Sequence, residues 1–160
     1  MLVENDYSRN YLLTALAAGP DLVASALEGL TDAEADARPD PDRFNIREAV
    51  AHLAEWDPIF LGRIKRMVVE DHPTMPGYDE GQLAIEHHYE LTDPAEQAAL
   101  FRERRIETIT FLKSLSPDQW NRTGNRPEIG IMTVEAIATL MPLHDTYHLK
   151  QIIEWRKATG

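Results

Sequence analysis

Apolar residues recur at intervals of three and four positions in four long stretches of the chain. These stretches run from Asp6 to Leu30, from Asn45 to about Val69, from Asp93 to about Leu115 and from Thr133 to about Lys157. Such spacing places the apolar side chains on one face of an α-helix. No stretch shows a convincing strand pattern, and residues 123–130, which include glycine and proline, are predicted to form a loop. The pattern therefore predicts an all-α protein with four amphipathic helices.

Residues that cap helices stand where three of these helices are predicted to begin. Asn45, Asp93 and Thr133 each occupy an N-cap position, where a side-chain oxygen accepts a hydrogen bond from a free amide of the first turn. Two further capping boxes, Thr31 to Glu34 and Ser116 to Gln119, predict short helical turns.

The first and second predicted helices each contain an internal proline. Pro20 and Pro58 lack the amide proton that would bond the carbonyls of Leu16 and Ala54, four residues earlier. We therefore expect a bend in the first helix and another in the second.

The connection between the second and third long helices is unusually long. It covers about twenty residues, from Asp71 to Thr92, with at most a short helix near Glu80 to His87. Antiparallel neighbours in a bundle are normally joined by roughly 2–8 residues, so this length predicts a crossover along the bundle. The expected fold is a four-helix bundle in up-down-down-up order, formed by residues 1–160 as a single domain.

Composition excludes several classes of function. The formal net charge of −11 argues against nucleic-acid binding, and the lack of cysteine excludes disulfides and thiolate metal sites. No apolar run approaches the ~20 residues that span a bilayer, and Met1 to Asn10 carries no signal-peptide core. We expect a cytoplasmic protein that acts on a small molecule.

The last helix carries two histidines inside its apolar stripe. His144 and His148 are one turn apart, and His52 lies at the edge of the apolar face of the second long helix. A buried imidazole needs partners for its ring nitrogens, and a partner that several imidazoles can share is a metal ion. His72, His87 and His88, in or near the crossover, are predicted to be surface residues.

The positions of these histidines along their helices agree with the predicted topology. His52 lies about 10 Å from the start of its helix, and His148 roughly 14 Å from the end of the last helix. Antiparallel helices would bring all three histidines to a similar height, whereas parallel helices would offset His52 from the midpoint of His144 and His148 by about 9 Å. The length of the crossover and the histidine positions thus predict the same order of helices.

Two charged residues also project toward the interior, and a third lies beside His144 but points off the axis. Asp57 and Arg105 lie on the inner faces of neighbouring helices, where an unpaired charge is strongly destabilising. They are expected to form an ion pair, or Arg105 is expected to bind an anionic substrate near the metal. Asp145 is a further candidate, as the acceptor that orients a metal-binding histidine.

The chain resembles the DinB/YfiT-like superfamily of bacterial metalloenzymes. The residues that carry the resemblance are Asn45 to Leu53 and the run from His144 to Gln151, with Thr133 before it. The resemblance implies an up-down-down-up bundle, often a homodimer, that holds zinc or nickel with three histidines. Carried over by position, these ligands are His52, His144 and His148.

Two activities and two non-catalytic alternatives follow. A three-histidine site leaves coordination positions open, as in catalytic zinc sites, so a hydrolase is expected. The resemblance also implies a transferase that uses a low-molecular-weight thiol as co-substrate. The alternatives are a metal- or ligand-binding dimer with a sensor or stress role, and a bundle in which the histidines only form hydrogen bonds.

Overall fold

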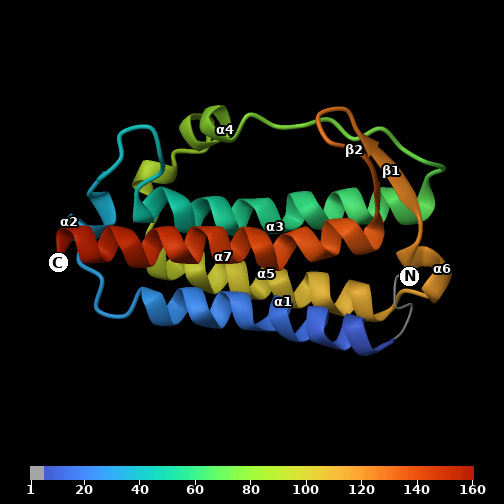
Figure 1. The fold of residues 1–160 in the computed structure, drawn as a ribbon. Coiled ribbons are helices and arrows are strands. Elements are labelled where there is room, and N and C mark those ends of the chain that lie inside the picture. The colour runs from blue at the N-terminus through green and yellow to red at the C-terminus, as the bar shows by residue number, and fades with distance from the viewer. Residues whose placement is uncertain (1–5) are drawn as a thin grey trace.

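Four long helices form the body of the protein. The structure, a computed structural model, describes residues 6–160. The first half of the segment Met1 to Asn10, which is expected to carry no signal-peptide core, lies outside the described residues. The long helices are α1 (Asp6–Ala26), α3 (Ile46–Val69), α5 (Pro94–Lys113) and α7 (Val134–Thr159) (Figure 1). The first helix ends at Ala26 rather than Leu30, and Gly29 follows with a φ of 67°, as is common after a helix end.

The directions of these helices confirm the up-down-down-up order. Figure 1 shows α1 and α7 running one way and α3 and α5 the other. Helices α5 and α7 each pack against both α1 and α3. The two helices predicted to carry the histidines, α3 and α7, are therefore antiparallel neighbours.

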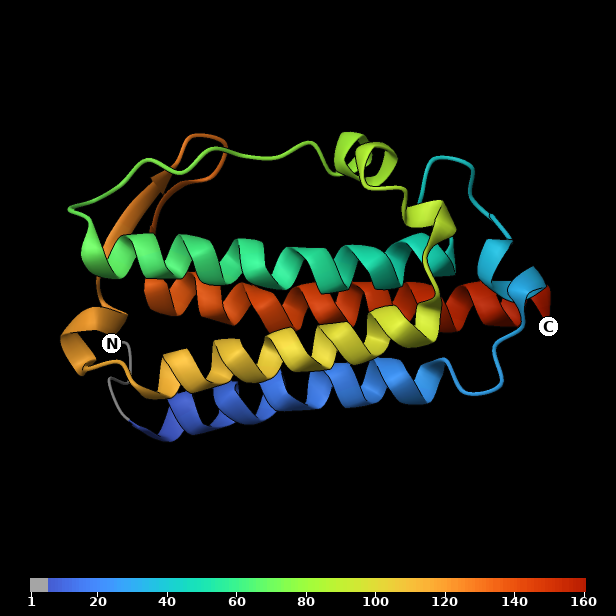
Figure 2. The same cartoon turned by 180° about the vertical axis from the view of Figure 1, so that it is seen from behind.

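The predicted crossover returns the chain along the outside of the bundle (Figures 1 and 2). It contains the short helix α4 (Glu80–Glu86) and the 3₁₀ turn η1 (Tyr89–Leu91). The two predicted short turns are also present, as α2 (Asp32–Asp36) and α6 (Pro117–Trp120), and each begins with a complete capping box.

The segment predicted to be a loop is instead part of a β-hairpin. Strands β1 (Thr123–Arg126) and β2 (Gly130–Thr133) pair in antiparallel register. The hairpin is fastened to the crossover, because Asn125 exchanges backbone hydrogen bonds of 2.8 Å with Met75 and Pro73. These strands lack an alternating apolar pattern, so tertiary contacts decide their structure.

Helix α1 continues through Pro20, and helix α3 continues through Pro58. The carbonyl of Leu16 accepts a hydrogen bond of 2.9 Å from Arg105, and the carbonyl of Ala54 accepts one of 2.5 Å from Arg104. Neighbouring arginines of α5 thus replace the amide protons that the prolines lack. Within residues 6–160, no helix combines the length and apolarity needed to cross a membrane.

Candidate metal centre

Helices α3 and α7 bring His52, His144 and His148 together in the bundle. One ring nitrogen from each histidine can be chosen so that all three lie within 4.8 Å of one another. The Nε2 atoms of His52 and His144 are 3.0 Å apart. Because α3 and α7 are antiparallel, the three histidines lie at similar positions along the bundle axis, as predicted.

The cluster is enclosed by aromatic rings. His52 is fully buried, His148 is 6 % exposed and His144 is half-buried. The ring centroid of Trp56 lies 4.6 Å from that of His52, and Phe60 lies 5.6 Å from His144. These rings keep water away from most of the cluster and leave His144 as its most accessible member.

Burial keeps the three imidazoles in the neutral form that binds metals. Burial, and then the neighbouring histidines, lower the pKa of His52 to about 2. Burial, then His148 and Arg105, lower the pKa of His144 to about 3. Burial also lowers the pKa of His148, although its hydrogen bond to Gln151 opposes that shift. Neutral imidazole is the ligand form, so these pKa shifts favour metal binding at neutral pH.

Gln151 holds His148 in a defined orientation. Its Oε1 lies 3.0 Å from Nδ1 of His148, and its Nε2 donates a 2.7 Å hydrogen bond to the carbonyl of Phe44. The amide is therefore oriented with its oxygen toward the histidine, so Nδ1 carries the proton and Nε2 keeps its lone pair free. Sequence reasoning did not assign this role to Gln151, although its position three residues after His148 was a usable signal.

The spacing of the cluster fits a metal ion, which would replace the contact between the Nε2 atoms of His52 and His144. Two nitrogen ligands at ~2.1 Å from one ion are separated by roughly 3 Å, which matches the spacing between His52 and His144. Nitrogen ligands alone suit zinc, nickel, copper and iron.

Two hollows adjoin the cluster, and Glu80 of α4 lines both. One has a volume of about 320 Å³ and includes His144, Trp56 and Phe60 among its lining residues. The other has a volume of about 280 Å³ and is bordered by His148. A small molecule therefore has space to approach the histidines from either side.

Arg105 forms an ion-pair cluster separate from the histidines. Its Nε donates to Asp57 at 2.6 Å, and its two terminal nitrogens donate to Asp145 at 2.6 and 2.9 Å. Burial alone would lower the pKa of Arg105, but hydrogen bonds and charge from both carboxylates raise it above its ordinary value. Thr108 donates a further hydrogen bond of 2.6 Å to Asp57.

The contacts in this cluster show which of the roles expected for Asp57, Arg105 and Asp145 fits the structure. The predicted pairing of Asp57 with Arg105 is what the structure contains, and Arg105 is only 2 % exposed. Its donors are engaged by protein groups, so it offers no open face to an anionic substrate. Asp145 accepts hydrogen bonds from Arg105 in place of the expected histidine, because it lies about 100° around α7 from His144.

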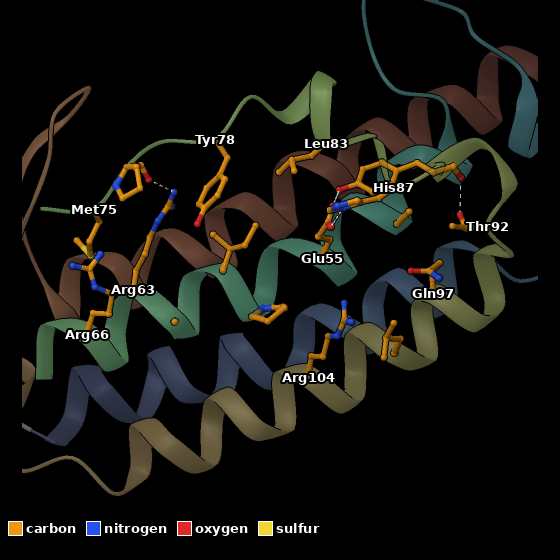
Figure 3. A pocket seen from close by; sticks show the side chains of 17 residues that line it. Glu55, Arg63, Arg66, Met75, Tyr78, Leu83, His87, Thr92, Gln97 and Arg104 are labelled. Carbon is orange, nitrogen blue, oxygen red and sulfur yellow. Dashed lines mark hydrogen bonds and ion pairs between the residues drawn. The ribbon is translucent and has the colours of Figure 1, made fainter. Parts of the chain in front are cut away.

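The remaining histidines lie at the surface, as predicted. His72, His87 and His88 are all exposed. His87 belongs to a hydrogen-bonded group with Glu55 and Tyr89, which lines the largest cavity among those described, of about 840 Å³ (Figure 3). That cavity lies between α3, α5 and the crossover, and none of the three clustered histidines lines it.

Comparison with known proteins agrees with this arrangement. The sequence profile of the DinB superfamily matches residues 15–152. The chain belongs to the DinB superfamily. A Bacillus subtilis (strain 168) member named "Putative metal-dependent hydrolase YfiT" is 26 % identical over 142 residues, covering 88 % of this chain and 80 % of that protein. The Halalkalibacterium halodurans protein "Putative metal-dependent hydrolase BH0277" is 30 % identical over 110 residues, covering 68 % and 63 %.

A solved structure has the same fold. The structure of YfiT from Bacillus subtilis, described as "a probable metal-dependent hydrolase with an unusual four-helix bundle topology", superposes with a TM-score of 0.91. The match covers 98 % of this chain and 90 % of that one, at 24 % sequence identity. At this identity the likeness establishes the bundle topology and leaves the chemistry to be argued from the site.

Proposed function

We propose that this protein is a metal-dependent hydrolase of small molecules, with a divalent cation, zinc or nickel, held by His52, His144 and His148. The observation that carries the proposal is the convergence of three neutral imidazoles beside two hollows. The names of the relatives point to the same class of activity.

The protein's own residues would have distinct tasks in this reaction. A bound divalent cation would lower the pKa of a water molecule or thiol that it binds and polarise a substrate carbonyl. Gln151 keeps Nε2 of His148 directed at the cluster, and Trp56 and Phe60 exclude bulk water. Glu80 is the candidate group for accepting and returning a proton, because it lines both hollows. The residue is exposed, so only partial loss of water around the carboxylate, and then Asp79, raise its pKa.

A thiol-dependent S-transferase is the second candidate. The observation that favours it is the presence of two separate hollows, one beside His144 and one beside His148. Such an arrangement provides separate places for a low-molecular-weight thiol and for the electrophile that it attacks. The absence of cysteine requires the thiol to be a co-substrate.

Turnover assays separate these candidates. Zinc- and nickel-loaded protein is assayed against panels of esters and amides, and against electrophiles with and without bacterial thiols. Thiol-independent hydrolysis supports the hydrolase, and strictly thiol-dependent turnover supports the transferase. His148→Ala should abolish either activity, and Glu80→Gln should lower turnover while the metal content stays unchanged. Activity that survives His148→Ala contradicts the proposal.

Metal binding without turnover in any assay would support a non-catalytic binding or sensor role instead. The homodimer and the cytoplasmic location are further proposals, which rest on the family resemblance. Sedimentation equilibrium of the untagged protein would test the dimer, for which a mass of twice 18.2 kDa is expected.

A further inference from the structure

Arg63 is a buried arginine without a carboxylate partner. Its side chain extends from α3 toward the crossover beside Tyr78 (Figure 3), and the residue is 6 % exposed. Nη2 donates a hydrogen bond of 3.2 Å to the carbonyl of Pro76, while Nε is buried with no hydrogen-bond partner. Among residues 6–160, no carboxylate lies within 4.0 Å of the guanidinium.

The other arginines of α3 show how unusual this is. Arg47 is paired with Asp36 at 2.7 Å, and Arg66 is paired with Glu70 at 2.7 Å. Both of these arginines are more accessible to water than Arg63. The most deeply buried arginine of the helix is thus the one without a carboxylate within ion-pair distance in the described part of the chain. The ring of Tyr78, whose centroid is 5.4 Å from Cζ, and the more distant Glu128 offset the cost of burying this charge in part, and an anionic ligand would offset it further.

Arg63 lines the same hollow as the candidate metal ligand His144. The other walls of this 320 Å³ hollow are mainly apolar and aromatic, and its lining includes Trp56, Phe60, Leu140 and Leu143. A molecule in the hollow would therefore meet an apolar wall, a metal-binding imidazole and an unpaired guanidinium. This combination suits a ligand with an apolar body and one anionic group.

The surrounding charges indicate how much negative charge the hollow accepts. Arg126 also lines the hollow, and its Nε lies 3.4 Å from the carboxylate of Glu128. Burial, and then Arg126, lower the pKa of Arg63, while Tyr78 and Glu128 oppose that shift. Arg63 and Arg126 carry two positive charges against the carboxylates of Glu128 and Glu80, so the net charge lies between zero and about +1, the higher value applying when Glu80 is protonated. A carboxylate fits this balance better than the dianion of a phosphate monoester.

We propose that Arg63, assisted by Arg126, binds the carboxylate of the molecule on which the metal site acts, so that the substrates are small carboxylic acids with an apolar body. This inference rests on the proposed function, because only a reaction at the metal site would make the bound carboxylic acid a substrate. The anion site itself consists of residues outside the histidine cluster and can be tested without metal.

The test measures binding to metal-free protein, prepared with a chelator, by isothermal titration calorimetry. The probes are phenylacetate, its neutral analogue phenylacetamide, and inorganic phosphate. We expect saturable binding of phenylacetate and at least about tenfold weaker binding of the other two. Arg63→Gln should weaken phenylacetate binding at least tenfold, and Arg66→Gln, one turn away on the same helix, should leave it unchanged.

Further variants keep the test decisive if Arg63→Gln does not fold. Arg63→Lys retains the charge and should bind phenylacetate more tightly than Arg63→Gln, and Arg126→Gln should weaken binding a few-fold. The proposal is overturned if wild-type protein binds no phenylacetate, if phenylacetamide binds equally well, or if neither arginine variant changes binding. Because the probe is measured without metal, a failure of the metal proposal would leave this result interpretable.

Discussion

Two polar clusters occupy the core of the bundle, and they differ in how completely the protein satisfies them. In the arginine cluster, the guanidinium of Arg105 is matched by the carboxylates of Asp57 and Asp145, and the carbonyl of Leu16 completes its partners. In the histidine cluster, three neutral bases direct ring nitrogens to within 4.8 Å of one another. The charges of the first cluster are matched by protein groups, whereas the second is a set of nitrogen donors that one ion can share.

The difference shows how a structural polar group can be told from a binding site. Arg105 of α5 bonds groups from α1, α3 and α7, so it joins all four long helices. The histidines come from α3 and α7 alone and adjoin hollows. His144 and Asp145 are neighbours in sequence, yet each belongs to a different cluster because successive residues on a helix face different directions.

The largest expected effect comes from breaking the arginine cluster. Arg105→Met leaves two buried carboxylates unpaired, so the free energy of unfolding should fall by about 3–5 kcal/mol. Urea denaturation measures this change. Arg102→Met, which removes an exposed arginine paired with Asp21, should cost less than about 1 kcal/mol. Equal losses in the two variants would show that the buried cluster does not join the helices.

Acid should destabilise the metal-free protein through the histidine cluster. The pKa values of His52, His144 and His148 are lowered in the folded state, so below the ordinary value of about 6.5 the unfolded chain binds more protons. Stability is therefore lost as pH falls. From pH 7 to 5.5 the loss should be about 1 kcal/mol for each of His52 and His144, with a further loss from His148.

Urea denaturation at a series of pH values measures this dependence. His144→Asn removes one titrating group and should reduce the slope. A slope that is flat in the wild type, or unchanged in the variant, would contradict the account of three buried neutral imidazoles.

A methyl group at Gly19 tests how tightly the arginine cluster is packed. An added Cβ would lie 2.3 Å from Oδ2 of Asp145, so Gly19→Ala should displace the ion pair and cost about 2–3 kcal/mol. Gly62 of α3 is the matched control, since a Cβ there meets no atom within 4 Å. Gly62→Ala should stabilise the helix by about 0.5–1 kcal/mol, as thermal denaturation can show. If Gly19→Ala and Gly62→Ala change the stability equally, the close approach of Asp145 to Gly19 does not restrict the residue at position 19.

The smallest expected effect concerns the orientation of His148. Gln151→Leu removes the acceptor for Nδ1, so zinc affinity should fall by about 10- to 100-fold, or about 1.4–2.7 kcal/mol. Competition with a chromophoric chelator measures the affinity. Lys150→Leu, at an exposed neighbouring position, should change nothing. An unchanged affinity in Gln151→Leu would show that this hydrogen bond does not orient a ligand.

The sequence predicts the bundle and the place of the histidines because both depend on regular helical geometry. The period of α3 and α7 directs His52, His144 and His148 inward, and the long crossover determines the direction of α7 relative to α3.

Features that depend on tertiary contacts were harder to predict. The hairpin formed by residues 123–133 depends on its bonds to the crossover, and the partner of Asp145 depends on how α5 and α7 pack. The unpaired state of Arg63 is likewise invisible in the sequence, because it reflects which carboxylates are absent from its surroundings. Helical periodicity specifies a direction for each side chain but does not identify what lies opposite.

The most direct test of the central claim is the metal content of protein purified without an affinity tag. Mass spectrometric metal analysis should find about one divalent ion per chain in the wild type, and none in His52→Ala at unchanged helical content. Arg105→Lys, which alters only the arginine cluster, should retain the ion. A wild-type protein that stays metal-free when supplied with zinc or nickel would contradict the account, as would full metal content in His52→Ala.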